Sequence, residues 1–150
     1  MKSLRSDDTR LEILNRIAQV SPADSARWGR MTSHEMLCHL RDSYELALGE
    51  RHASPADNWF LRTMGKPISL WVPVHWVKNY PTRPEVDQRK GGSRPVEFTA
   101  DTKSLQATVI VFCEMEQPRA AHPMFGPMNL AEWRRWGYLH ADHHLRQFGR

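Results

Sequence analysis

The sequence predicts an all-α fold, a four-helix bundle with a long irregular segment rich in tryptophan and proline between its second and third helices. Three observations predict it. Four stretches carry apolar residues at helical spacing, two of them begin with a capping-box pattern, and no period repeats along the chain. With 150 residues, the chain has the length of one domain and can bury a sizeable core. We therefore expect residues 1–150 to form a single domain.

The first two helices are predicted in the N-terminal third of the chain. Apolar side chains recur at helical spacing over residues 8–20, and Pro22 stops this pattern. The second helix begins at Thr32, whose hydroxyl can accept the amide of Glu35 while the Glu35 carboxylate reaches back. Gly49 ends that helix.

A third and a last helix are predicted in the C-terminal half. Residues 101–116 have the length of a helix and an apolar face, although residues 108–112 also have β propensity. The last helix begins at Asn129, where Glu132 three residues later completes a second capping pattern. It continues to the residue before Gly149, which closes it.

The segment at residues 51–98 is the least regular part of the chain. It holds six of the ten prolines together with Trp59, Trp71 and Trp76. We expect a short helix at residues 58–64, followed by a long excursion that its aromatic side chains hold against the bundle. Such an excursion could shape the mouth of a pocket.

Composition and charge argue against several classes of protein. The mean hydropathy of −0.63 predicts no membrane partner, and the charged N-terminus lacks a signal-peptide core, so we expect a cytoplasmic protein. A pI of about 9.4 would suit nucleic acid. However, basic and acidic residues are interspersed, and we expect no nucleic-acid partner. Cys38 and Cys113 are far apart and are expected to be buried free thiols.

Candidate functional residues come from the eight histidines, at positions 34, 39, 52, 75, 122, 140, 143 and 144. His140 and His144 lie about 40° apart around a helix and one turn apart along it, so both imidazoles can reach one ion. Their stripe includes Trp133 and Gly137 and faces the expected interior of the bundle. His39 combines a helical context with an inward stripe, which makes it the leading candidate for a third metal ligand.

Other histidines are expected to have lesser roles. His34 lies about 140° from His39 around the helix and is expected near the helix cap in solvent. His143 lies about 60° from His140, where it could orient a neighbour or replace a ligand. His122 precedes a rigid turn before the last helix and could line the pocket.

A second interpretation of the three inward histidines weighs evenly with metal binding. In it, His39, His140 and His144 are core histidines that hydrogen-bond to one another, to Gln147 or to water. Protonated imidazoles would repel each other, whereas a metal ion keeps all three neutral. From the residues alone, both interpretations stay open.

Two separated parts of the chain carry recognisable motifs. The first is RWGRMTSHEMLCHL at residues 27–40, and the second combines HPMFG at 122–126, NLAEW at 129–133 and HADHHLRQFG at 140–149. These motifs resemble the signatures of DinB-like proteins, specifically of the DUF1569 branch. The central WVKNYPTRP at residues 76–84 also fits that branch, so the resemblance extends over most of the chain.

This resemblance implies a bundle of up-down-down-up connectivity that holds a divalent metal ion with three histidines. Position by position, the first ligand falls on His39, and the two ligands of the last helix fall on His140 and His144. His143 stands where relatives have a tyrosine or another residue, so no role transfers to it. Zinc is the first choice of ion, and nickel, iron or manganese are alternatives.

A three-histidine site with an open position suits catalysis, since it can acidify a bound water or thiol. Glu35 and Asp42 are candidates to orient His39, although exposure to solvent is the stronger expectation for both. Asp142 is excluded because it lies about 200° from the ligands of its helix. Several other residues near the candidate ligands are expected to serve mainly packing or solvation: Tyr44, Tyr138, Trp133, Trp136 and Arg146.

Two functions are compatible with such a site. The first is a metal-dependent thiol transferase or hydrolase that acts on a small electrophilic substrate. The resemblance supports it, because known activities of DinB-like proteins include transfer of low-molecular-weight thiols such as bacillithiol or mycothiol. The alternative is a non-catalytic module that binds a metal or a small ligand in a stress response. A homodimer is a candidate assembly, with the tryptophan-rich segment as its interface.

Overall fold

The computed structural model describes residues 1–56 and 59–150 and confirms the all-α class. In chain order the helices are α1 (Asp7–Ala18), α2 (Ser33–Leu48), η1 (Leu61–Gly65), α3 (Lys66–Trp71), η2 (Pro84–Val86), α4 (Phe98–Glu114) and α5 (Leu130–Gln147). These described ranges contain no β-strand. None of their helices combines the length and the apolar character needed to cross a lipid bilayer.

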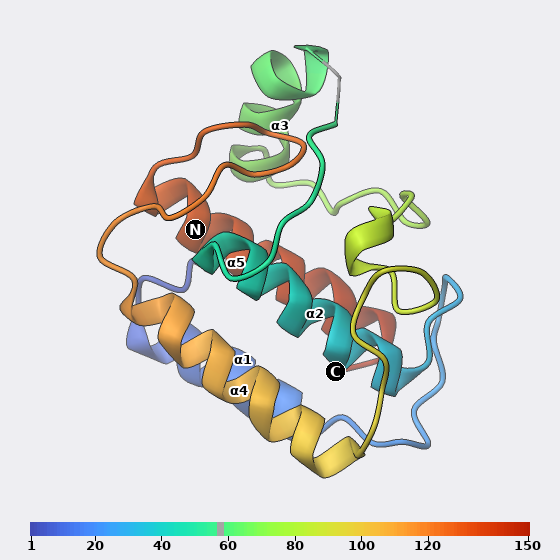
Figure 1. Ribbon diagram of the computed structural model, residues 1–150. Helices are drawn as coiled ribbons and strands as arrows, with labels where there is room; N and C mark the ends of the chain where they lie inside the picture. The colour runs from blue at the N-terminus through green and yellow to red at the C-terminus, as the bar shows by residue number, and fades with distance from the viewer. Residues whose placement is uncertain (57–58) are drawn as a thin grey trace.

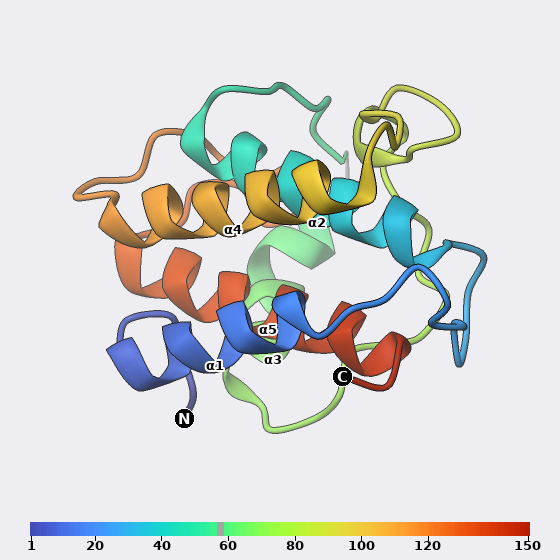
Figure 2. The same cartoon turned by 90° about the horizontal axis from the view of Figure 1, so that it is seen from below.

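The longer helices α1, α2, α4 and α5 pack against one another around the core (Figure 1). α1 contacts α4 and α5, and α2 contacts the same two helices. Seen from below, α2 and α4 lie in one layer and α1 and α5 in the other (Figure 2). The largest fully buried side chains include Ile13 of α1, Tyr44 of α2, Phe112 of α4 and Trp133 of α5. The arrangement places α2 directly against α5.

Capping boxes begin α2 and α5, as the sequence predicts. The Thr32 hydroxyl accepts the Glu35 N–H at 3.1 Å, and the Glu35 carboxylate accepts the Thr32 N–H at 2.8 Å. Asn129 and Glu132 repeat this exchange at 2.9 Å and 2.8 Å. Gly49, with a φ of 76°, ends α2 in the left-handed conformation that glycine adopts most easily. The caps thus fix where the two helices that carry the candidate ligands begin.

The first and third predicted helices correspond to α1 and α4, with ends shifted by a few residues. α4 begins earlier than predicted because the Glu97 carboxylate accepts two backbone N–H groups of its first turn. The β propensity of residues 108–112 is overridden because Val109 and Phe112 are fully buried on one face of the helix. Helical packing decides the structure of this stretch.

The short helix predicted at residues 58–64 is longer than expected. Asn58 lies outside the described residues, but from Trp59 onward the chain is helical through η1 and α3 to Trp71. The η1 turn is π-helical, and the helix tightens to α-helical geometry at Lys66. The helical element therefore continues to Trp71, seven residues beyond the predicted end at Met64.

Only part of the aromatic anchoring predicted for this segment is present. Trp76 packs against the core, and its indole N–H donates to the Ser69 carbonyl at 2.9 Å. Trp59 and Trp71, in contrast, are exposed. The fully buried Leu70 anchors α3 instead.

Gly137 lies where α5 closely approaches α4 and the N-terminal segment. A Cβ atom at this position would stand 2.7 Å from Phe112 Cε1 and 3.0 Å from Leu4 Cδ1, and both of those side chains are fully buried. The Gly137 carbonyl also accepts the Tyr44 hydroxyl at 2.8 Å, which links α5 to α2. The absence of a side chain therefore lets the helices approach.

Gly137→Ala is expected to destabilise the protein by about 1–2 kcal/mol, because the crowding exceeds the roughly 0.5–1 kcal/mol that alanine gains over glycine in a helix. Urea unfolding measures the difference. Gly65→Ala is the control, since its Cβ would meet the flexible end of the Leu61 side chain and little stability should be lost. Equal free energies of unfolding for the two variants would contradict the role given to Gly137.

His122 organises the turn that leads to α5. Its Nδ1 accepts the N–H groups of Met124 and Phe125 at 3.1 Å and 3.2 Å, so this nitrogen carries no proton. The ring stacks on Phe125 and packs against Trp136, and burial lowers the pKa of His122 to about 3. The geometry gives this residue a structural role within the turn.

Because His122 is buried in its neutral form, the free energy of unfolding of the protein should depend on pH. Its pKa is 6.5 when unperturbed and about 3 in the fold, so the unfolded chain binds the proton more readily between these values. The stabilisation is present above pH 6.5 and is lost as the pH falls toward the lower value. His122→Asn, whose amide oxygen can accept the same N–H groups, is expected to lose stability less steeply over this interval. Urea unfolding at several pH values tests this, and parallel curves for the two proteins would contradict it.

Candidate metal centre

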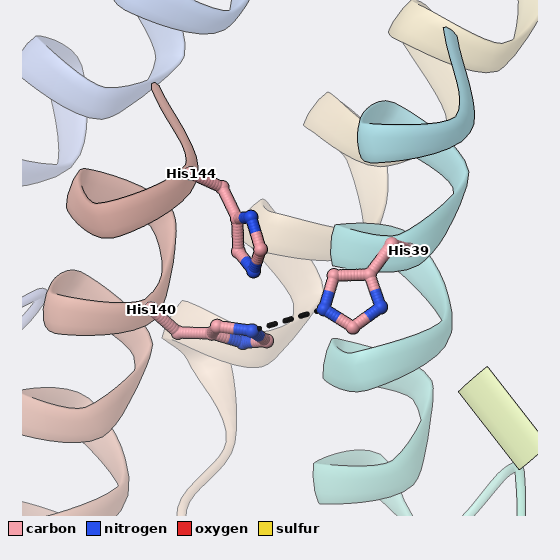
Figure 3. A group of neighbouring side chains, drawn as sticks. All are labelled: His39, His140 and His144. Carbon is pink, nitrogen blue, oxygen red and sulfur yellow. Dashed lines mark hydrogen bonds between the residues drawn. The ribbon is translucent and has the colours of Figure 1, made fainter. Parts of the chain in front are cut away.

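The structure brings together all three histidines that the sequence singles out. His39 from α2 and His140 and His144 from α5 point toward one another (Figure 3). Their ring centroids are 5.1 Å apart for His39 and His140, 4.7 Å for His39 and His144, and 4.9 Å for His140 and His144. One nitrogen of each ring lies within 4.8 Å of the other two. We call this group the histidine triad, and it could hold a metal ion.

His39 is oriented by a backbone carbonyl. Its Nδ1–H donates to the Val86 carbonyl at 2.8 Å, at the end of η2. Because a neutral imidazole carries one proton, Nε2 then presents its lone pair to the triad. No side-chain pattern could reveal this contact, since every residue has a carbonyl group.

His144 is oriented by a short chain of hydrogen bonds. The amide nitrogen of Gln147 donates to the Trp28 carbonyl at 2.6 Å, so the amide oxygen faces His144. That oxygen lies 2.9 Å from His144 Nδ1, which therefore carries the proton and donates it. His144 Nε2 is left as the free lone pair, so Gln147 supports the triad as well as the core.

His140 is the least satisfied member of the triad. Its Nε2 lies 3.2 Å from His39 Nε2 (Figure 3), while its Nδ1 is buried and has no hydrogen-bond partner among the described residues. If Nε2 carries the proton, it donates to His39 and leaves Nδ1 an unpaired acceptor. If Nδ1 carries the proton, two lone pairs face each other at 3.2 Å. A cation at the triad would remove that repulsion.

The surroundings keep the triad neutral. Burial is the main cause that lowers the pKa of His39, His140 and His144 below the ordinary histidine value, and positive charge on neighbouring histidines would lower the pKa of His140 and His144 further. The Val86 carbonyl opposes the effect of burial on His39. Unprotonated imidazole is the form that binds metals.

Neither acidic residue considered for orienting His39 contacts it in the described structure. Asp42 is fully buried, so the expectation that it faces solvent is wrong; it accepts hydrogen bonds from Arg51, Gln88 and the Ser93 N–H at 3.0 Å, 2.9 Å and 2.7 Å. These contacts tie the segment after η2 to α2. Glu35 belongs to the capping box and pairs with Arg89 at 3.0 Å.

The expectation that His34 lies in solvent is also wrong. Its Nε2 lies 2.7 Å from an Asp101 oxygen, and Asp101 additionally accepts from Arg41 and from the Val96 N–H. With Cys38, these residues form a second group whose potential ligand atoms lie within 4.8 Å of one another. Because Asp101 already has three protein partners and burial raises the pKa of Cys38 to about 12, we interpret the group as a structural link between α2 and α4.

The other residues considered in the sequence are buried in the core or form ion pairs. His143 is buried edge-on against Trp28 at 5.6 Å, and burial lowers its pKa to about 4. Asp142, which was excluded as a partner, pairs with Arg16 and Arg146. The remaining aromatic candidates are buried, namely Tyr44, Tyr138, Trp133 and Trp136. Both cysteines are buried and free, as predicted.

Comparison with protein families confirms the DUF1569 part of the resemblance seen in the motifs. Residues 2–150 match the family described as "Protein of unknown function (DUF1569)". Comparisons with curated proteins and with solved structures give no match. The family match includes both helices that carry the triad and the segment between them, and the chain therefore belongs to the DUF1569 family.

Proposed function

We propose that this protein is a divalent-metal-dependent enzyme of the DinB-like type, a thiol transferase or hydrolase that acts on a small electrophilic substrate. The convergence of three neutral imidazoles from α2 and α5 carries the proposal. The proposal includes a DinB-like four-helix bundle of up-down-down-up connectivity, with an excursion between its second and third helices. It also includes the triad as the ligand set.

The spacing of one pair of triad nitrogens supports binding of a first-row divalent ion. Two imidazole nitrogens bound to one tetrahedral zinc ion stand about 3.3 Å apart, and His39 Nε2 and His140 Nε2 are separated by 3.2 Å. His39 and His144 also have the hydrogen-bonded second nitrogen that is typical of histidine ligands. Zinc is the first choice, and nickel, iron and manganese accept the same ligands.

A divalent ion bound at the triad would lower the pKa of a water or a thiol that occupies an open coordination position. His39, His140 and His144 would hold it, while the Val86 carbonyl and Gln147 keep two of the rings in orientation. The three ligands are neutral and leave the charge of the ion uncompensated. This favours an anionic guest such as a thiolate, which is the nucleophile that a thiol transferase needs.

A second candidate function is a non-catalytic metal-binding or ligand-binding module. The observation that favours it is the position of Trp76, whose ring centroid lies 5.9 Å from that of His140. In addition, no triad residue lines either of two surface pockets, one beside Tyr80 and Pro84 and one beside His52 and Arg119. If the indole blocks the guest position, the site binds a metal without turning over a substrate.

Metal content tests the ligand set. The purified protein is expected to hold about one divalent ion per chain, and His144→Ala is expected to lower the metal affinity at least about tenfold. His143→Ala, which removes a buried histidine next to the triad, is the matched control and should keep the metal. Elemental analysis after dialysis gives the occupancies. Equal metal content in His144→Ala and the unaltered protein would reject the assignment of His144.

Thiol consumption separates the enzyme from the binding module. The metal-loaded protein is mixed with bacillithiol, mycothiol or glutathione and a panel of electrophiles, and loss of thiol and of electrophile is followed. A transferase consumes both, and a hydrolase consumes the electrophile alone. His52→Ala, at an exposed position, should retain the activity, and His144→Ala should lose it. A protein that holds its metal but shows no metal-dependent turnover would support the binding module.

A further inference from the structure

Exposed apolar side chains are concentrated between residues 59 and 80. Nine large ones are found there, with Trp59 76% and Val77 74% exposed: Trp59, Phe60, Met64, Ile68, Trp71, Val72, Val74, Val77 and Tyr80. We call these nine residues the apolar ridge. The other exposed large apolar residues, such as Leu11 and Val96, are scattered over the rest of the described chain. So many exposed apolar side chains within one segment indicate an interaction site, whereas scattered single residues do not.

The helical part of the ridge is amphipathic. On its inner side, Leu70 is fully buried, the Leu70 carbonyl accepts Arg135 Nε at 2.8 Å, and Lys66 pairs with Glu132 of α5 at 3.0 Å. On its outer side, apolar residues recur every four positions at Phe60, Met64 and Ile68. Figure 1 shows this element, labelled α3, projecting beyond the four packed helices. One face of this helical element thus packs against α5, and the opposite face is exposed to solvent.

The stretch of sequence that carries the ridge has basic residues but no acidic ones. No aspartate or glutamate occurs from Trp59 to Pro84, whereas Arg62, Lys66, Lys78 and Arg83 are all basic. Lys66 and Arg83 form ion pairs with glutamates outside this stretch. Arg62 and Lys78 are exposed, and neither has an ion pair within the described part of the chain. Lys78 Nζ lies over the Trp28 ring, 4.6 Å from its centroid. The segment therefore combines exposed apolar groups with two exposed basic side chains.

We propose that the apolar ridge docks this protein on an anionic lipid surface. Lying in the interface, an amphipathic element buries its apolar face, and its arginine and lysine side chains attract anionic headgroups. Tryptophan and tyrosine prefer this interface, and the ridge exposes Trp59, Trp71 and Tyr80. Docking of this kind goes beyond the proposed function and does not rest on the triad.

The charge pattern favours a lipid surface over a second copy of the chain. A symmetric dimer through the ridge would oppose two basic surfaces without an acidic residue from either ridge to pair them. Attachment in the plane of the surface also needs no spanning helix. The mean hydropathy could not predict it, because that value averages exposed and buried residues.

Vesicle flotation with the full chain tests the apolar part of the proposal. The protein is expected to bind vesicles of phosphatidylcholine with about one third phosphatidylglycerol at least about tenfold more tightly than vesicles of phosphatidylcholine alone. Phe60→Ser/Met64→Ser should weaken this binding at least about tenfold. Ile110→Ser/Val111→Ser, which replaces two exposed apolar residues of α4, should leave it unchanged. Equal binding by both double variants, or no binding of the unaltered protein, would overturn the proposal.

The charge part is tested separately. Arg62→Gln/Lys78→Gln should weaken binding to the anionic vesicles, and added salt should do the same. The matched control is Arg5→Gln/Lys103→Gln, which removes two exposed basic residues elsewhere and should bind as the unaltered protein does. Equal loss in both variants would mean that net charge alone governs binding and would overturn the role of the ridge. Sedimentation analysis adds an outcome: a dimer that Phe60→Ser/Met64→Ser abolishes, without lipid binding, assigns the ridge to a second copy.

Discussion

The contact between α2 and α5 is the constraint on which the site depends, because it opposes two buried imidazole nitrogens at 3.2 Å. The proton of His39 is committed to the Val86 carbonyl, so the two nitrogens can share only a proton from His140 or a cation. Gly137 lets α5 approach α4 and the N-terminal segment, and its carbonyl ties α5 to α2 by accepting the Tyr44 hydroxyl. Packing and polar contacts thus bring the two helices to the distance at which the triad forms.

The parts of the fold that were predictable are those that local chemistry determines. The capping boxes at Thr32 and Asn129 need only their own helices, and the spacing of His140 and His144 follows from helical geometry. His39 was also found, since an apolar stripe gives its direction. The burial of Asp42 could not be found in this way, because two of its three partners, Gln88 and Ser93, lie 46 and 51 positions away along the chain.

The segment between α2 and α4 divides into two parts with different physical roles. Its second part, from η2 to Ser93, is drawn against α2 by the Val86 carbonyl and by hydrogen bonds to Asp42. Its first part, which contains the apolar ridge, is fixed at Leu70 and leaves its outer face exposed. The sequence did not separate the two parts, because the contact at Val86 is made by a backbone carbonyl and Gln88 and Ser93 lie far from Asp42 along the chain.

Trp76 lies between the histidine triad and the helix that carries the apolar ridge. It lies within the sequence of the ridge but is itself half-buried, and its ring centroid is 5.9 Å from His140 and 6.2 Å from His143. Its indole N–H is bound to the Ser69 carbonyl of α3, so the side chain that flanks the triad is held by the helix that carries the ridge. Trp76, which flanks the triad, and the exposed apolar face therefore belong to one segment of the chain. Its inner side is held by hydrogen bonds of the Ser69 and Leu70 carbonyls and by the buried Leu70 side chain, and its outer side exposes apolar residues.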